Sequence, residues 1–403
     1  MTMPEQKKAV VPRLRFPEFR DAGPWEVKRL GDVAEVNAAG DLDFSQFSPV
    51  LTQEHIYPIY SNSIAQEGLY GFSTYPKYKK NSVTITARGT LGVAFYRDHD
   101  FVGIGRLLIV NARQEISPRY LKEVWNYLVR EPFENGGIPQ LTAIKARTIK
   151  LVFPSLPEQQ KIADCLSSLD ELIKLQAKQL EALQAHKKGL MQQLFPREGE
   201  TTPRLRFPEF RDAGPWENIQ VSDFGTIVTG KTPSTSNPKY WNGRFAWVTP
   251  TDISDTKYIY TTDRLLTSEG VQLIGVLPEN TVLITCIASI GKNAILKVPG
   301  SCNQQINAII PNSNFNSDFI YYLFCKNQTI LQNQAGTSAT AIIPKSAFEK
   351  FYFHVPKLPE QQKIADCLSS LDELIELQAK QLEALKAHKK GLMQQLFPQE
   401  IDL

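Results

Sequence analysis

The sequence contains few residues of the types that form disulfides or bind metals. It has five cysteines and five histidines in 403 residues, and no two cysteines form a Cys-x-x-Cys pair. A disulfide scaffold and a zinc site both need closely spaced side chains of these kinds, so neither is indicated. We expect the cysteines and histidines to serve packing, with no metal and no cofactor bound by this chain.

Long hydrophobic runs are also missing. No segment approaches the roughly 18 consecutive apolar residues of a membrane helix, and the first residues, MTMPEQKKAVVPRLRF, lack the apolar core of a signal peptide. We therefore expect a cytoplasmic protein without a membrane partner. The composition, with 42% hydrophobic and 22% charged residues, is typical of globular chains, and the length suits two or three domains.

The clearest feature of the sequence is an internal repeat. The 15-letter motif PRLRFPEFRDAGPWE occurs at residues 12–26 and again, without change, at 203–217. A longer segment at 156–196 recurs at 358–398 with two substitutions, Lys174 to Glu376 and Gln184 to Lys386. We call these four segments the frame and the residues between them, 27–155 and 218–357, the inserts. The frame is nearly identical in its two copies, whereas the inserts diverge in sequence and length.

The long frame segments have the pattern of coiled-coil helices. Apolar residues in the first copy follow a 4-3 spacing at Ile162, Leu166, Leu169, Ile173, Leu180, Leu183, Leu190 and Leu194. Gln176 and Lys187 complete this seam, and the second copy repeats it from Ile364 to Leu396 with Gln378 and Lys389. A leucine-proline pair opens each segment and a phenylalanine-proline pair closes it, which marks the helix ends.

The length of these helices predicts that they pair with each other. About 37 residues at roughly 1.5 Å each give a rod of about 55 Å, too long for one small domain to cover its apolar stripe. We expect the two copies to pack as an antiparallel coiled coil with pseudo-twofold symmetry. Parallel or intermolecular pairing is the alternative.

The frame and part of the second insert resemble a known family. LRFPEF…W, LPEQQKIA, KKGLMQQLF and GKTPSTSNPKYWNGRFAWVTPTDI are all similar to motifs of the specificity subunit of type I restriction-modification systems. The resemblance covers essentially the whole chain, including its two-copy layout. It implies a subunit that reads DNA without an active site of its own. The partners would be two modification subunits, which use S-adenosylmethionine to methylate adenine N6, and ATP-dependent restriction subunits that require Mg²⁺.

The predicted fold is α+β, with two globular target recognition domains each followed by a long helix. We expect a first domain at 1–155, the first helix at 156–196, a second domain at 197–357, and the second helix with a tail at 358–403. Both inserts share an order of β-rich runs, at 83–86, 93–96 and 107–110 and at 282–285, 294–298 and 308–310. An aromatic helix then follows at 118–129 or 318–325.

Two segments match the patterns of a phosphate-binding loop and a methyltransferase cofactor loop, but we expect both to be structural. Residues 225–232, GTIVTGKT, match the phosphate-loop pattern, but their β-branched middle favours a strand, and the prolines after Thr232 oppose a helix. Residues 101–105, FVGIG, have the glycine spacing of a methyltransferase cofactor loop, yet the apolar run after them also favours a strand. A cryptic nuclease is the enzymatic alternative, and no signature supports it.

Positive charge is concentrated in the inserts. Residues 27–155 contain 15 basic and 12 acidic residues, and residues 218–357 contain 11 and 8, so each insert has a net charge of +3. The whole chain also has a formal charge of +3, which leaves the remainder at −3. This distribution suits contacts between the inserts and phosphates.

Basic, aromatic and amide side chains in the inserts are our candidates for DNA contact, since they suit phosphates, guanine edges and adenine edges. In the first insert they are Tyr60, Asn62, Lys77, Lys79, Lys80, Arg88 and Thr90. In the second they are Lys231, Ser234, Thr235, Lys239, Trp241, Thr249, Thr251, Asn303, Gln304 and Gln305. For any single residue a solvated or structural role is the more common one, so the groups carry the prediction.

Together with these candidates, the resemblance implies that each insert reads one half of a split, asymmetric DNA site and that the helices set the spacer between the halves. A coiled-coil adaptor with protein-binding inserts remains an alternative. So does the specificity component of a differently organised restriction system.

Overall fold

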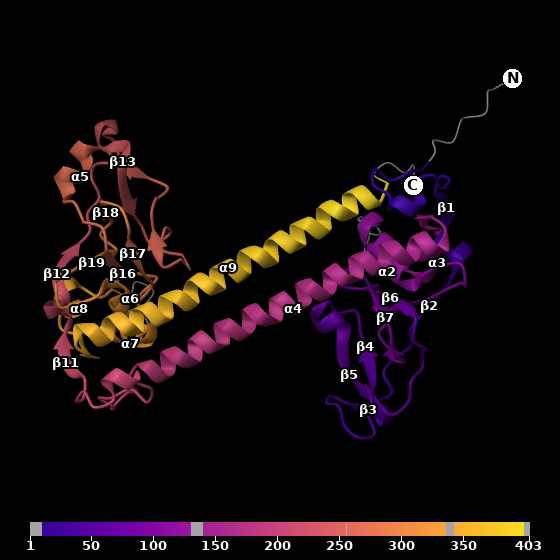
Figure 1. Ribbon diagram of the computed structural model, residues 1–403, viewed down its shortest axis with the longest axis horizontal. Coiled ribbons are helices and arrows are strands. Elements are labelled where there is room, and N and C mark those ends of the chain that lie inside the picture. Colours follow the sequence, from indigo (N-terminus) through magenta and orange to yellow (C-terminus); the bar gives the residue numbers. More distant parts are fainter. Residues whose placement is uncertain (1–9, 130–139, 255, 336–341, 399–403) are drawn as a thin grey trace. The chain divides into compact units, whose positions relative to one another are not determined.

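The computed structural model describes residues 10–129, 140–254, 256–335 and 342–398. The chain forms two compact units (Figure 1). Unit 1 comprises Met1–Ala177 and Lys380–Leu403, and unit 2 comprises Lys178–Ala379. Each unit therefore contains one insert, the first part of one long helix and the last part of the other.

Unit 1 is built around a four-stranded antiparallel sheet in the order β2-β9-β6-β7. Its strands are β2 (Ala34–Ala38), β9 (Leu108–Ala112), β6 (Ser82–Ile85) and β7 (Ala94–Arg97). A smaller sheet follows the order β3 (Phe47–Ser48), β5 (Leu69–Ser73), β4 (Tyr57–Tyr60) and β8 (Val102–Gly103). Unit 1 also contains the strand pair β1 (Glu26–Arg29) and β10 (Lys150–Phe153) and the short α-helices α1 (Leu30–Val33), α2 (Pro118–Leu128) and α3 (Ala143–Thr148).

Unit 2 repeats this plan with additions. Its main sheet has the order β12 (Gly225–Thr229), β19 (Ile306–Pro311), β16 (Thr281–Thr285), β17 (Asn293–Leu296) and β14 (Tyr258–Ile259). The smaller sheet is β15 (Leu265–Leu266), β13 (Trp241–Val248) and β18 (Gly300–Cys302), and β11 (Glu217–Gln220) pairs with β20 (Tyr352–Val355). The helices are α5 (Ser268–Ile274), α6 (Ser317–Lys326), α7 (Gln328–Ala335) and α8 (Lys345–Phe348).

The order of β-rich runs and the aromatic helix predicted for each insert are confirmed. The six predicted runs correspond to β6, β7 and β9 in unit 1 and to β16, β17 and β19 in unit 2, and the aromatic helices are α2 and α6. The strands predicted at the two motifs that imitate catalytic loops are confirmed. Residues 225–229 of the first motif form β12, and the apolar run that follows the second motif, 101–105, forms β9. The two inserts are versions of one α+β domain.

The two long helices, α4 (Leu156–Leu194) and α9 (Leu358–Leu396), have 39 residues each. Every predicted seam position on both helices is buried or half-buried, whereas Leu172 and Leu175 outside the seam are 51% and 62% exposed. The 4-3 pattern therefore identified the packing face correctly.

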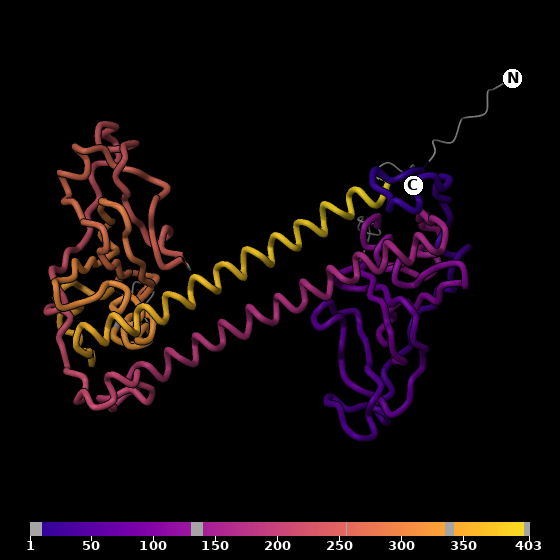
Figure 2. The backbone as a smooth tube through the Cα atoms, in the orientation of Figure 1, coloured from indigo at the N-terminus to yellow at the C-terminus, as the bar shows by residue number. Residues whose placement is uncertain are grey.

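Within each unit the two helices pack in opposite directions. In unit 1 Leu396, the last residue of α9, and Phe397 after it share a core with Ile162 and Leu166 from the first turns of α4. Figure 2 shows this return, with the yellow end of the chain against the indigo domain. In unit 2 Leu194 at the end of α4 packs with residues from the first turns of α9. The predicted antiparallel pairing is confirmed.

Aromatic residues join frame and insert in both cores. In unit 1 Phe397 stacks on Tyr127 at a centroid distance of 5.0 Å and meets Trp25 edge-on. In unit 2 Phe195 stacks on Phe319 at 5.5 Å and meets Trp216 edge-on. The closing phenylalanine of each long helix thus packs into the unit that contains the other insert. Among the described residues, no helix is long and apolar enough to cross a membrane.

Candidate nucleic-acid interface

A buried ion pair ties the opening motif to the start of each long helix. In unit 1 Arg15 binds both carboxylate oxygens of Glu158 at 2.8 and 2.5 Å and also donates to the carbonyl of Ala22. In unit 2 Arg206 binds Glu360 at 2.8 and 2.6 Å in the same way. These side chains are less than a tenth exposed, so the pairing is essential to avoid isolated buried charges.

A glutamine beside each of these glutamates binds the backbone of the insert. Gln159 accepts a hydrogen bond from the amide of Ser117, the N-cap of α2, and donates to the carbonyls of Glu115 and Pro154. Gln361 accepts from the amide of Asn316 in the same manner. Because the partners are backbone groups, this contact does not depend on which side chains the insert carries.

A charged cluster joins α2, α4 and α9 in unit 1. Lys389 of α9 lies 2.6 Å from Asp170 of α4 and 3.6 Å from Glu123 of α2. Lys122 lies 2.5 Å from the carboxylate of Glu123 and 3.1 Å from that of Asp170. Burial alone would raise the pKa of Asp170, but the two lysines together hold it below its usual value. The seam lysine thus contributes to the contact between the helices and to the docking of the insert.

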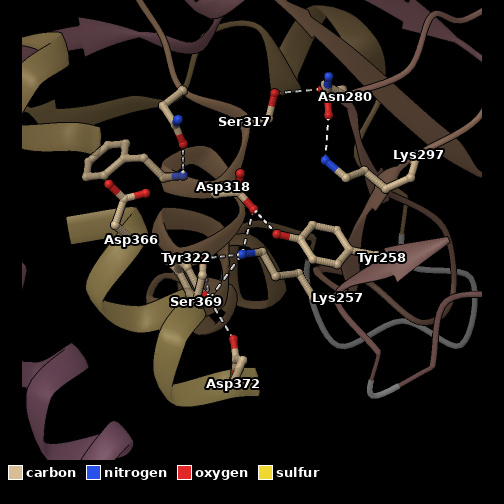
Figure 3. Close-up of polar contacts among 12 residues, drawn as sticks. Lys257, Tyr258, Asn280, Lys297, Ser317, Asp318, Tyr322, Asp366, Ser369 and Asp372 are labelled. Atoms are coloured by element: carbon tan, nitrogen blue, oxygen red, sulfur yellow. Dashed lines mark hydrogen bonds and ion pairs between the residues drawn. The ribbon is translucent and has the colours of Figure 1, made fainter. Parts of the chain in front are cut away.

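The corresponding cluster in unit 2 has different partners on the insert side (Figure 3). Lys187 pairs with Asp372, the frame equivalents of Lys389 and Asp170. Asp372 also accepts a hydrogen bond of 2.5 Å from the hydroxyl of Tyr322, which occupies the place of Glu123. A neutral hydroxyl therefore replaces a carboxylate at the same point of the frame.

Lys257 adds a second connection in unit 2. Its ammonium group is 2.6 Å from Asp318 and 2.7 Å from Ser369 of α9, and it is 3.1 Å from the hydroxyl of Tyr322 (Figure 3). Tyr258 donates to the same carboxylate of Asp318 at 2.6 Å. Burial lowers the pKa of Lys257, and the nearby carboxylates only partly offset this effect. The segment that leads from β13 to β14 is thereby fixed to α6 and α9.

Among the candidates in the first insert, Tyr60 is a core residue. It is 7% exposed, its hydroxyl lies 2.8 Å from Nε2 of His99, and the guanidinium of Arg97 lies 3.5 Å from its ring centroid. Burial raises the pKa of its hydroxyl. Its side chain therefore packs in the core, beneath the candidate DNA-binding surface of unit 1.

Asn62 connects two loops of unit 1. Its amide nitrogen donates to the carbonyl of Gly105 at 2.6 Å, and its amide oxygen accepts from the backbone of Ala87 at 2.7 Å. Ala87 precedes Arg88 and Thr90, which lie exposed in the turn between β6 and β7. Asn62 thus fixes the base of the turn that presents these two candidates.

The basic candidates of unit 1 lie in one exposed segment. Lys77, Lys79 and Lys80 are all exposed, and Lys79 lies 3.1 Å from Asp100. The same aspartate accepts a hydrogen bond from the backbone of Lys80, so it also fixes the chain path. Lys77 and Lys80 have exposed side chains suited to phosphate contact.

In unit 2 two buried tryptophans tie one candidate loop to the small sheet. The indole nitrogen of Trp241 donates to the carbonyl of Ser234 at 3.0 Å, and that of Trp247 donates to Lys231 at 3.1 Å. Lys231, Ser234, Thr235 and Lys239 lie exposed on this loop. Trp241 is 7% exposed, so it supports the loop rather than forming its surface.

The amide candidates of unit 2 lie beside the same loop. Thr232 donates to the side chain of Gln304 at 2.6 Å, and the backbone of Lys231 donates to the carbonyl of Cys302 at 2.8 Å. Asn303 is 7% exposed, and its side chain forms hydrogen bonds with the side chain and the backbone of Gln305. Gln304, in contrast, is exposed. Of the three predicted amides, Gln304 has the exposure that base contact requires.

Thr249 and Thr251 belong to a turn held by an aspartate. Thr249 donates to Asp252 through its hydroxyl at 2.6 Å and through its backbone at 2.8 Å, and the two threonine hydroxyls are 2.7 Å apart. Thr251 is exposed and Thr249 is half-buried. These hydrogen bonds define the shape of the turn, and Thr251 is its exposed member.

The sequence interpretation missed Arg97 and Arg264, which both stack on aromatic rings. It also missed the neighbouring glutamate and glutamine at the start of each long helix, Glu158-Gln159 and Glu360-Gln361. These residues, and their partners Arg15 and Arg206, are the same in both copies of the frame, which could have indicated their role. Within the described residues, no group of three or more histidine, cysteine, aspartate or glutamate side chains is placed to hold a metal.

Comparison with known proteins identifies both halves of the chain. Residues 23–185 and 214–387 each match the family described as the type I restriction modification DNA specificity domain. The chain is 36% identical over 178 residues to the type I restriction enzyme MjaIX specificity subunit of Methanocaldococcus jannaschii, covering 42% of this chain and 41% of that protein. It is 25% identical over 315 residues to the putative MjaX specificity subunit of the same organism, covering 74% and 72%.

The fold is also similar to a solved structure. The type-I restriction-modification S subunit from M. genitalium matches 97% of this chain and 100% of its own, with a TM-score of 0.67 and 14% identity. Each of the two matched ranges contains one insert and most of the long helix that follows it. The chain therefore contains two copies of the same family domain. The chain belongs to the family of type I restriction-modification DNA specificity subunits.

Proposed function

We propose that this chain directs a type I restriction-modification complex to a split, asymmetric DNA target. The segments 1–155 and 197–357 serve as the two target recognition domains, and each reads one half of the target. The observation that carries this proposal is the pairing of a nearly invariant frame with two divergent inserts of one fold. Identical reading domains would instead suit a symmetric target.

The exposed candidates suit DNA contact as two groups. In unit 1 the segment from Lys77 to Lys80 and the turn with Arg88 and Thr90 are both exposed. In unit 2 Lys231, Gln304 and Thr251 are exposed, and the loop that contains Lys231 is tied to Gln304 through the hydroxyl of Thr232. Lysines contribute affinity through phosphates, while arginine and amide groups contribute sequence preference through base edges. As a specificity subunit, the chain supplies recognition and leaves catalysis to its partners.

The frame sets the spacer and holds the partners in this proposal. Helices of 39 residues are about 58 Å long, which is compatible with half-sites about one DNA turn, or roughly 34 Å, apart. Two modification subunits would bind to the two near-identical frame copies and, with S-adenosylmethionine, methylate adenine N6. Restriction subunits with ATP and Mg²⁺ would add cleavage, and the complex would act in the cytoplasm.

The direct test is to map N6-methyladenine across the host genome with and without this gene. Loss of one split, asymmetric motif on deletion supports the proposal and gives both half-sites and the spacer. If no motif changes although the modification subunit co-purifies with the chain, this DNA-reading role is contradicted for that host. If no modification subunit co-purifies either, the adaptor alternative is favoured.

A further inference from the structure

Each unit contains an arginine stacked on an aromatic ring beside the candidate surface, but the two arginines differ in exposure. Arg97 of unit 1 is 1% exposed, whereas Arg264 of unit 2 is exposed. The guanidinium carbon of each lies 3.5 Å from a ring centroid, that of Tyr60 for Arg97 and that of Trp241 for Arg264. The same stacking geometry is thus used once inside the domain and once at its surface.

The hydrogen bonds of Arg97 identify it as structural. Its Nε donates to the hydroxyl of Thr84 at 3.0 Å, and a terminal nitrogen donates to the carbonyl of Glu67 at 2.7 Å. The carboxylate of Glu67 lies 3.7 Å away as well. A buried guanidinium with these partners has little capacity left for a ligand.

Arg264 differs because, among the residues that the structure describes, its guanidinium has no hydrogen-bond acceptor. Across the described parts of the chain, no carbonyl or carboxylate accepts a hydrogen bond from this group, and no ion pair involves it. Its main chain is fixed, since the carbonyl of Arg264 accepts from the hydroxyl of Thr262 at 2.6 Å and from the backbone of Trp247 at 3.3 Å. The backbone of Arg264 is therefore held in place, while its guanidinium pairs with no polar group of the described segments.

The platform under Arg264 is rigid. Trp241 and Trp247 meet edge to face at a centroid distance of 4.9 Å and an angle of 84°, and they are 7% and 4% exposed. Both indole nitrogens donate to carbonyls of the loop that carries Lys231 and Ser234. A guanidinium stacked on such a ring has its plane set in advance, so it loses less conformational freedom on forming a paired hydrogen bond.

We propose that Arg264 reads a guanine in the half-site of the second recognition domain, donating paired hydrogen bonds to O6 and N7. Arginine is the residue best matched to this acceptor pair in the major groove. The exposed Lys231 and Lys239 on the neighbouring loop contact phosphates on either side and hold the duplex against the platform. This inference rests on the proposed function and assigns one specificity-determining residue to it.

The test compares three versions of the full chain, each purified with its modification subunit: wild type, Arg264→Lys and Arg264→Ala. Their methylation motifs are mapped in cells that lack the native gene. We expect one guanine of the second half-site to become unspecified in Arg264→Ala and less strictly specified in Arg264→Lys, whose ammonium group can still donate to guanine, while the first half-site is unchanged. Discrimination against the wrong base at that position should fall about 5- to 150-fold in binding competition.

Two further measurements separate base reading from charge and folding. Replacing that guanine with 7-deazaguanine, which lacks the N7 acceptor, should weaken binding by the wild type and leave Arg264→Ala, which has no side-chain donor, unaffected. The salt dependence of Arg264→Lys should match that of the wild type because the charge is retained. Arg211→Ala, which removes an exposed charge from the opening motif of unit 2, should leave the motif unchanged.

Several results would overturn the inference. A second half-site without guanine, an unchanged motif in both variants, or complete loss of DNA binding in the folded Arg264→Lys protein would each contradict it. All of these presuppose a methylated motif for the wild type. If the wild-type complex specifies no motif at all, the proposed function itself fails, which is a distinguishable outcome.

Discussion

Units 1 and 2 present the same frame to two different inserts, and the contacts between them fall into two classes. Gln159 and Gln361 bind backbone groups, so they make the same contact in both units. Lys389 and Lys187 instead face insert side chains that differ. Lys389 lies 3.6 Å from the carboxylate of Glu123, whereas Lys187 lies 5.4 Å from the ring centroid of Tyr322, whose hydroxyl binds Asp372. The comparison teaches that a constant frame accepts divergent domains through backbone contacts, while side-chain contacts are adapted to each insert.

The largest effect should come from the ion pair inside the frame. Glu158→Ala or Glu360→Ala leaves a buried arginine without its carboxylate, and each should destabilise its unit by about 3–5 kcal/mol, measured by urea unfolding. Glu18→Ala, which removes the exposed pair with Lys161, is the control and should barely move the unfolding midpoint. A large loss in one unit and none in the other would mean that the two frame copies are not equivalent.

The seam lysines should separate the two units. Lys389→Met leaves Glu123, whose side chain is 3% exposed, with Lys122 as its remaining cation, and we expect a loss of roughly 2–4 kcal/mol. Lys187→Met should cost less, about half as much, because Asp372 keeps the hydroxyl of Tyr322. Equal losses in the two variants, measured by thermal or urea unfolding, would contradict the distinction between a charged and a neutral insert partner.

The backbone-binding glutamines should behave alike. Gln159→Ala and Gln361→Ala each remove an acceptor from a helix N-cap amide and donors from two carbonyls, so we expect about 1–3 kcal/mol of destabilisation in either unit. Hydrogen exchange at the amides of Ser117 and Asn316 reports the same loss locally. A marked difference between the two variants would show that this contact depends on insert side chains after all.

The smallest effect concerns alkaline pH. Burial would lower the pKa of Lys122, but Glu123 and Asp170 raise it above its usual value, so the stability it contributes is present below the unfolded pKa and is lost as pH rises through the folded one. Burial keeps the pKa of Lys257 below its usual value. The stability of unit 2 therefore rises as pH increases from the lowered pKa of Lys257 in the folded state to its ordinary pKa in the unfolded chain. Unfolding of Lys122→Met and Lys257→Met against wild type from pH 8 to 11 should therefore give slopes of opposite sign, and slopes of the same sign would contradict the assignment.

Periodic features were predictable because they depend on local sequence. The 4-3 spacing and the leucine-proline signals gave the long helices and their packing face, and alternating β-rich runs gave the sheet strands. Duplication within one chain supplied a further constraint, since anything kept identical in both copies had to serve both inserts. That reasoning, applied to Glu158 and Gln159, would also have identified the frame contacts.

The recognition surfaces were harder to predict because they depend on contacts between distant residues. Tyr60 and Trp241 are of residue types that often contact bases, yet both side chains are buried in the domain. Arg264 lies in a segment without a recognisable motif, and its stacking depends on Trp241, 23 positions earlier in the sequence. Which polar side chains remain exposed is decided by packing partners that no local pattern reveals.

The most direct test of the central claim replaces residues 218–357 with a second copy of residues 27–155 between the unchanged frame segments. The methylation motif of the resulting complex is then mapped and compared with that of the wild type. If each insert reads one half-site independently of its frame copy, the new motif contains the half-site of the first insert twice. A motif that retains the original second half-site would contradict the account.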